Sequence, residues 1–82
     1  MDAIEKVKSQ LIGGARGMTF KSAPLEGGIA VMGFIGDEPE ASFWIKDGKV
    51  LAGNGNARAW SGHNLSYAPA GIDYHSINKA VS

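Results

Sequence analysis

The sequence predicts an α+β fold: an antiparallel meander of four to five short strands, with an N-terminal and a C-terminal helix packed on one face of the sheet in two layers. Three observations predict it. A chain of 82 residues has room for a single domain, residues 1–82. Apolar residues recur at helical spacing at both ends of the chain and at strand spacing between them. Short turn sequences separate the strands, as in a meander whose helices cover the sheet.

Helices are predicted at both ends of the chain. They span residues 2–12 and 72–81, with apolar faces formed by Ile4, Val7, Leu11 and Ile12 in the first and by Tyr74, Ile77 and Val81 in the last. Asp2 can cap the first helix, with Glu5 three residues later, and Gly13-Gly14 can end it. Asp73 is expected to be the N-cap of the last helix.

Strand-like segments fill the middle of the chain. They are residues 18–22, 29–35, 42–46 and 49–52, with weaker candidates at 57–60 and 65–68. The segment 29–35 is apolar on both faces, which predicts a central strand covered at least in part on each side. Residues 23–28 are expected to form a loop, and residues 36–40 a polar turn.

The Asp47-Gly48 pair predicts a hairpin with a two-residue type I′ turn. The register that follows pairs Lys46 with Lys49, Ile45 with Val50, Trp44 with Leu51, and Phe43 with Ala52. Phe43 and its neighbours on one face form a core face, whereas Trp44 and Leu51 share the other face with two lysines. Two interpretations stay open. Trp44 lies under a helix while the lysines extend past the rim, or Trp44 and Leu51 form an exposed partner-binding patch.

Composition excludes several classes of protein. The absence of cysteine excludes a disulfide scaffold, a thiol nucleophile and a Cys-type zinc site. Charges interleave with apolar residues at the N-terminus, which is not typical of a signal peptide. No apolar run approaches ~18 residues, so no membrane span is expected. We therefore expect a cytoplasmic protein that does not bind membranes.

The glycine-rich segment Gly53–Asn56 does not fit a nucleotide-binding motif. A dinucleotide fingerprint needs a third glycine where this chain has Arg58, and a long helix must follow. The Walker pattern is also absent around Gly48-Lys49, which Val50 follows in place of serine or threonine. A loop whose residues tolerate positive φ is the simpler interpretation, and no cofactor is expected.

Catalytic and metal sites also lack support in the sequence. The candidate residues are His63, His75, Ser61, Ser66 and Asp73. A hydrolytic triad could be assembled from them, but no nucleophile-elbow pattern supports it. Two histidines and one aspartate could in principle hold a metal, yet Asp73 and His75 are two residues apart and would lie on different faces of a helix. We therefore expect no enzymatic activity.

Charge is balanced overall and uneven locally. Formal net charge is zero; Lys6, Lys8, Arg16 and Lys21 lie in the first quarter, and Glu26, Asp37, Glu38 and Glu40 follow with no basic residue among them. The Asp37, Glu38 and Glu40 turn is either simply solvated or complementary to a basic surface on another protein, where it would raise association rate and specificity more than affinity.

These observations favour a small non-enzymatic protein-binding module. Its candidate partner-binding residues are Asp37, Glu38, Glu40, Trp44, Leu51 and Trp60. The profile resembles that of small phage or mobile-element proteins that inhibit host defence complexes, here by occluding a basic, nucleic-acid-binding site. This resemblance rests on size and the lack of motifs.

Two alternatives belong to other classes of function. The first is nucleic-acid binding through Arg16, Arg58, Trp60, Tyr67 and the lysines, which the zero net charge makes a weaker hypothesis. The second is self-association, since a thin core and a strand edge that needs protection both favour a homodimer.

Overall fold

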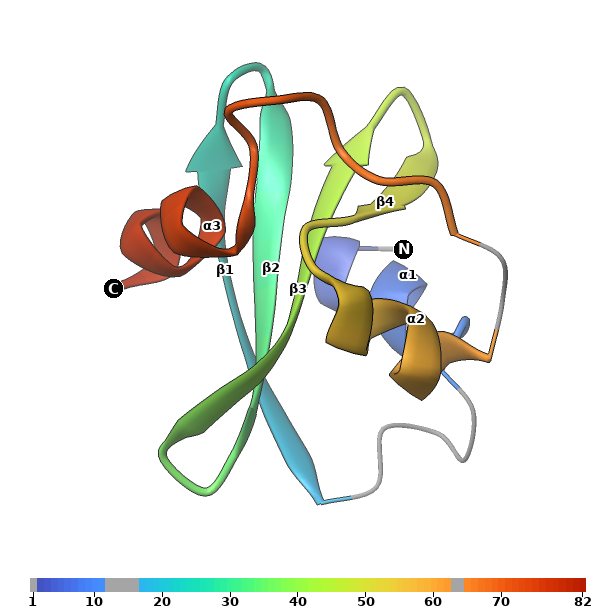
Figure 1. Cartoon of the computed structure of the whole chain (residues 1–82), viewed down its shortest axis with the longest axis vertical. Coiled ribbons are helices and arrows are strands. Elements are labelled where there is room, and N and C mark those ends of the chain that lie inside the picture. The colour runs from blue at the N-terminus through green and yellow to red at the C-terminus, as the bar shows by residue number, and fades with distance from the viewer. Residues whose placement is uncertain (1, 12–16, 63–64) are drawn as a thin grey trace.

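The computed structural model describes residues 2–11, 17–62 and 65–82 (Figure 1). Its centre is a four-stranded antiparallel sheet in the order β1-β2-β3-β4. The strands are β1 (Met18–Leu25), β2 (Gly28–Ile35), β3 (Glu38–Lys46) and β4 (Lys49–Ala52), and the helices are α1 (Ala3–Lys8), α2 (Gly55–Ser61) and α3 (Tyr74–Val81). The α+β class, the antiparallel meander and the packing of an N-terminal and a C-terminal helix against the sheet are confirmed.

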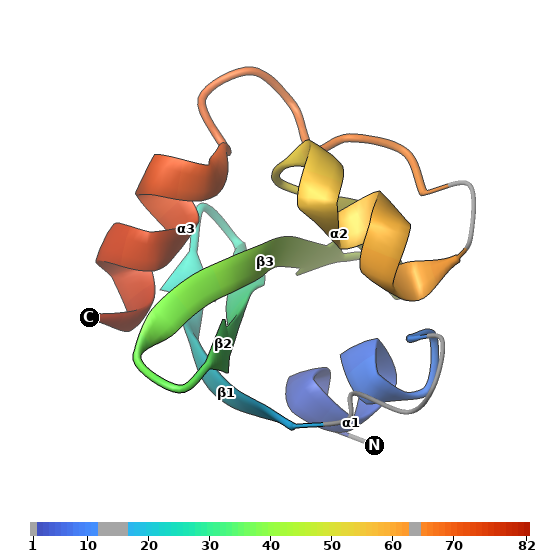
Figure 2. The same cartoon turned by 60° about the horizontal axis from the view of Figure 1, so that its bottom comes forward.

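The two terminal helices lie on opposite faces of the sheet, so the expectation that they share one face in two layers is wrong. Figure 2 shows α3 on one side of the sheet and α1 and α2 on the other. The reason is that the central strands are apolar on both faces. Val31 and Phe43 belong to a core cluster with Val7 of α1, whereas Met32 and Trp44 belong to a second cluster with α3. Both faces must therefore be covered.

The β3–β4 hairpin has the predicted register, from Phe43 opposite Ala52 to Lys46 opposite Lys49. Asp47 and Gly48 have φ values of 52° and 77°, as both central residues of a type I′ turn require. Phe43 and Ala52 lie in the first core cluster, and Leu51 packs against the second. The two faces of this hairpin are therefore those that the sequence predicts.

The β1–β2 connection is also a tight hairpin, so the loop expected at residues 23–28 is wrong. Leu25 pairs with Gly28, and Glu26 and Gly27 form the turn with φ values of 48° and 78°. Pro24 lies within β1, which is an edge strand, where a missing N–H donor is tolerated. The proline and glycines of this segment thus mark a strand end and a turn.

The weaker strand candidates are wrong. Residues 57–60 lie in α2, which ends at Gly62 with φ 65° in the left-handed region. A segment of four residues cannot separate strand from helix by periodicity alone, and alanine and arginine favour the helix. Residues 65–68 contribute only an isolated parallel bridge between Ala52 and Tyr67. Within the described residues the sheet therefore has four strands.

Side chains cap the terminal helices as the sequence predicts. The Asp2 carboxylate accepts a hydrogen bond of 2.8 Å from the Glu5 amide at the start of α1. Asp73 is the N-cap of α3, where it forms a reciprocal capping box with Ser76. The helix α1 is shorter than predicted, and its expected stop at Gly13-Gly14 lies outside the described residues. None of the described helices has the length and apolar character needed to cross a bilayer.

Candidate functional site

The predicted acidic turn is the two-residue connection between β2 and β3. Ile35 pairs with Glu38, which leaves Gly36 and Asp37 as its central residues. Only Gly36 has positive φ, at 62°, which fits a type II′ turn with glycine in its first central position. Asp37 and Glu38 are exposed, and Ile35 beside them is 40% exposed. The turn therefore places carboxylates next to an apolar side chain at one end of the sheet.

Glu40 lies at a β-bulge that follows this turn. Phe34 pairs with Pro39, and Gly33 pairs with Ala41, so Glu40 has no cross-strand partner. A bulge bends its strand and increases the local twist, and bulges recur near binding sites. Glu40 is half-buried. Among the described residues, no ion pair neutralises Glu40, Asp37 or Glu38.

Trp44 is part of the core. It is 6% exposed and packs with Met32 and Ile77 on the α3 face. Its indole N–H donates a hydrogen bond of 2.8 Å to the carbonyl oxygen of Leu25. Lys46 on the same face reaches outward, and its Nζ donates to the Gly27 carbonyl at 3.1 Å. This geometry corresponds to the first interpretation, a tryptophan under a helix beside lysines that extend past the rim.

The six candidate partner-binding residues do not form one surface. Leu51 is half-buried and packs against the α3-side cluster with Trp44. Trp60 is half-buried and packs against the other cluster, across the sheet. Asp37, Glu38 and Glu40 lie together at the β2–β3 end. Of the six, only Asp37 and Glu38 are exposed; they adjoin Ile35, and the half-buried Glu40 follows them in β3.

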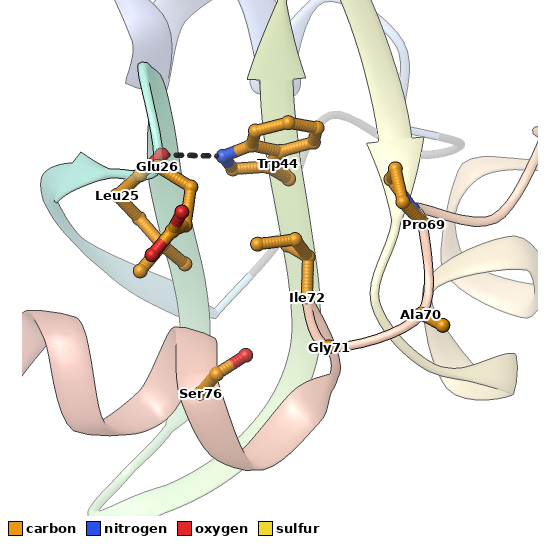
Figure 3. Close-up of a pocket in the computed structure, with 8 residues that line it drawn as sticks. All are labelled: Leu25, Glu26, Trp44, Pro69, Ala70, Gly71, Ile72 and Ser76. Carbon is orange, nitrogen blue, oxygen red and sulfur yellow. Dashed lines mark hydrogen bonds between the residues drawn. The ribbon is translucent and has the colours of Figure 1, made fainter.

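The structure reveals a pocket that the sequence does not indicate. Its volume is about 490 Å³, and its walls are Leu25, Glu26, Trp44, Pro69, Ala70, Gly71, Ile72 and Ser76 (Figure 3). Three distant segments build it: the β1–β2 turn, the middle of β3, and the connection into α3. Residues 69–71 read Pro-Ala-Gly, which is no recognised binding motif. No local motif connects them with Glu26, because the fold alone brings them together.

Asp73 and Ser61, two of the residues considered for catalysis or metal binding, have structural partners. Within residues 2–11, 17–62 and 65–82, no three histidine, aspartate or glutamate side chains are grouped so as to hold a metal ion. Hydrogen bonding from the backbone amide and the side chain of Ser76 lowers the pKa of Asp73 below its ordinary value of 3.8. The Ser61 hydroxyl donates to the Arg58 carbonyl at 3.1 Å. His63 lies outside the described residues.

The Gly53–Asn56 segment joins β4 to α2. The Asn54 side-chain oxygen accepts hydrogen bonds from the backbone amide and the hydroxyl of Ser42, at 3.2 and 3.0 Å. A Cβ on Gly53 would lie 2.6 Å from both Ile77 Cδ1 and Ser42 Oγ, so only glycine fits here without movement. Close packing between α3 and β3 accounts for this glycine.

Arg58 of α2 and the exposed Tyr67 form a cation–π pair. The Arg58 guanidinium lies 5.3 Å from the centre of the Tyr67 ring, and Tyr67 is 53% exposed. Arg58 and Tyr67, two of the residues considered for nucleic-acid binding, therefore lie together. Trp60 is half-buried and packs against the first core cluster, and Arg16 lies outside the described residues.

The chain matches no protein-family model, no curated protein and no solved structure. Its candidate sites are therefore judged on their geometry.

Proposed function

We propose that this protein is a non-enzymatic protein-binding module that uses the acidic β2–β3 turn to cover a basic surface of its partner. One observation carries the proposal: Asp37, Glu38 and Glu40 surround the turn beside Ile35, which is 40% exposed. An apolar contact with a charged rim is the usual arrangement of a protein interface. The carboxylates would speed association and exclude acidic competitors, while Ile35 would supply apolar contact.

The backbone of this site supports binding with little loss of entropy. A two-residue turn between paired strands holds Asp37 and Glu38 in one arrangement, and the partner need not order a long loop. A basic surface that accepts several carboxylates also suits phosphate groups. We propose, on this chemistry, that the partner is a nucleic-acid-binding component of a cytoplasmic host defence complex, and that a phage or mobile element supplies the inhibitor.

A charge-reversal experiment tests this proposal. The test variant replaces Asp37, Glu38 and Glu40 with lysine, and the matched control replaces Glu5, Glu26 and Asp47 with lysine. All three control residues are exposed, and both variants undergo the same change in net charge. Tagged forms of the two variants and the unmodified protein are used to capture partners from the native host, followed by quantitative mass spectrometry.

The expected result is a partner that is captured by the unmodified protein and the control, lost by the test variant, and released by added oligonucleotide. Both variants should remain folded, since neither set of residues belongs to the buried core, and their thermal midpoints verify this. Equal capture by the test variant would exclude the acidic turn as the binding site.

Nucleic-acid binding is the second candidate function, and the contact between Arg58 and the exposed Tyr67 ring favours it. Bases stack on aromatic rings, and arginine contacts phosphates. Oligonucleotide affinity should then fall steeply as salt is added, and Tyr67→Ala should weaken it. The absence of measurable binding at low salt would exclude this function.

Self-association is the third candidate. The β4 edge is partly covered, because Ala52 exchanges backbone hydrogen bonds with Ser66 and Ala68. On the other edge, β1 has β2 as its only strand neighbour in the described sheet. Light scattering at two protein concentrations decides this, and a constant monomer mass would exclude a homodimer through β1.

A further inference from the structure

The pocket on the α3 face lies apart from the acidic turn, at the other end of the sheet. Glu26 is a central residue of the β1–β2 turn, whereas Asp37 belongs to the β2–β3 turn at the opposite ends of the same strands. Its volume of about 490 Å³ falls within the range of about 300–1,000 Å³ that is typical of small-molecule sites. It can therefore be considered as a separate binding site.

The inner wall of the pocket is apolar. Trp44 and Ile72 are buried residues of the second core cluster, and Leu25 packs against them. Pro69, Ala70 and Gly71 form the side that leads into α3. Figure 3 shows Glu26 extending beside Leu25, on the side of the pocket opposite Pro69 and Ala70. A ligand in the pocket would contact these apolar side chains, the exposed polar surface of the lining and the Glu26 carboxylate.

The other polar side chains of the lining are already engaged. The Trp44 indole N–H donates to the Leu25 carbonyl. The Ser76 hydroxyl accepts from the Asp73 amide at 2.9 Å and donates to the Asp73 carbonyl at 3.0 Å. The Glu26 carboxylate, in contrast, has no hydrogen-bond or ion-pair partner among the described residues. The ammonium group of Lys46 donates to the carbonyl oxygen of the neighbouring residue Gly27. Lys46 is not one of the residues that line the pocket.

The turn itself gives no reason for a glutamate at this position. Glu26 has a φ of 48°, a conformation that glycine, asparagine and aspartate adopt more readily. Asp47 holds the equivalent place in the β3–β4 turn, with a φ of 52°, and does not line the pocket. These two residues therefore form a matched pair: each is an exposed acid at the first central position of a turn, and only one borders the pocket.

We propose that this pocket binds a small organic amine, with an aromatic or aliphatic body against Trp44, Leu25 and Ile72 and its ammonium group paired with Glu26. The apolar wall suits the body, and the unpaired carboxylate selects the cation over a neutral or anionic analogue. The inference is independent of the acidic turn, so either site can fail its test without affecting the other.

Nuclear magnetic resonance with three probes of similar shape tests the proposal. The probes are phenethylamine, phenethyl alcohol and hydrocinnamate, which carry a positive, a neutral and a negative group on the same aromatic body. The readout is the indole N–H resonance of Trp44, which Trp60→Phe identifies because the chain has two tryptophans. Phenethylamine should shift this resonance saturably and bind roughly two- to five-fold more tightly than phenethyl alcohol, as expected for one partly exposed charge pair. Hydrocinnamate should bind most weakly.

Two isosteric substitutions separate the role of Glu26 from a general effect of charge. Glu26→Gln should remove the preference for the amine over the alcohol, whereas Asp47→Asn should retain it. Because both residues are exposed, both variants should remain folded, and unchanged spectra away from the turns would verify this. The proposal is overturned if no probe shifts the Trp44 resonance saturably, if the amine and hydrocinnamate bind equally, or if both variants keep the same preference.

Discussion

The two faces of the sheet differ in how they are covered. Three segments cover the first face: α1, α2 and the chain around Leu65 bury Val31 and Phe43. On the second face, α3 and the segment that leads into it cover Met32 and Trp44. The described pocket opens on this second face, between the β1–β2 turn and the start of α3. The described residues of the first face form a packed core, and those of the second combine core packing with a pocket.

This difference follows from the shape of the covering elements. A single helix that crosses a sheet leaves parts of that face beyond its ends, and a connecting loop must fill them. Here the loop contains Pro69, Ala70 and Gly71, which line one side of the pocket. On the first face, α1 and α2 approach the sheet from different parts of the chain (Figure 2).

The largest expected effect comes from truncation of a core side chain on the first face. Phe43 is 1% exposed and is one of the largest fully buried side chains, so Phe43→Ala should lower the free energy of unfolding by about 3–5 kcal/mol. Because a domain of this kind is stabilised by only about 5–15 kcal/mol, much of the variant should be unfolded at modest temperature. Urea denaturation followed by circular dichroism measures this. A loss below about 1 kcal/mol would contradict the assignment of this face as a packed core.

An intermediate effect is expected where β2 approaches Trp44. A Cβ on Gly28 would lie 2.6 Å from the Ile45 carbonyl oxygen and 2.7 Å from Trp44 Nε1. Gly28→Ala should therefore displace Trp44 and lower the free energy of unfolding by about 1–3 kcal/mol, as overpacking generally does. The Trp44 indole resonance should also move, since its hydrogen bond to Leu25 would be strained.

A matched glycine gives the control for this prediction. Gly36 and Gly48 have open space where a Cβ would lie, but both have positive φ, so alanine there strains the backbone without touching Trp44. Gly48→Ala should lower stability and leave the Trp44 resonance in place. If Gly28→Ala moved that resonance no more than Gly48→Ala, close packing of β2 against Trp44 would be excluded.

Sequence patterns predicted the local features of this fold better than its layers. The Asp47-Gly48 turn, the register of its hairpin and the Asp73 cap depend on neighbouring residues, and all are confirmed. The side of the sheet on which each helix packs depends on long-range contacts. The apolar residues of segment 29–35 do not alternate with polar ones, which predicts that both faces of this strand are covered. The sequence pattern does not indicate which helix covers which face.

The candidate sites show the same contrast. The acidic turn is contiguous in sequence, so Asp37 and Glu38 could be predicted together and are found together. The pocket assembles Glu26, Trp44 and Ile72 from three segments, and no spacing along the chain links them. Residues 57–60 were misassigned for a related reason. Four residues are too few for periodicity to separate a strand from a helix. The hydrogen bonds between Asn54 and Ser42 at the start of α2 are tertiary contacts that local sequence does not reveal.

The smallest expected effect concerns the first turn of α3, the helix that covers the second face. The pKa of Asp73 is lower in the folded protein than its ordinary value of 3.8, chiefly because the Ser76 amide donates to the carboxylate. In acid, the unfolded chain therefore binds a proton more readily than the folded protein at this site. The stabilisation is fully present above the ordinary pKa and is lost as pH falls through the folded pKa.

Asp73→Asn keeps a capping oxygen and removes this titration. Its thermal midpoint should therefore be close to that of the unmodified protein at neutral pH and should fall less in acid. Asp47→Asn, which removes an exposed carboxylate with no capping role, should retain the original acid profile. The measurement is the thermal midpoint of the three proteins across this pH range. If all three fell in parallel as the pH is lowered, the role of Asp73 would be contradicted, and another group would cause the loss of stability in acid.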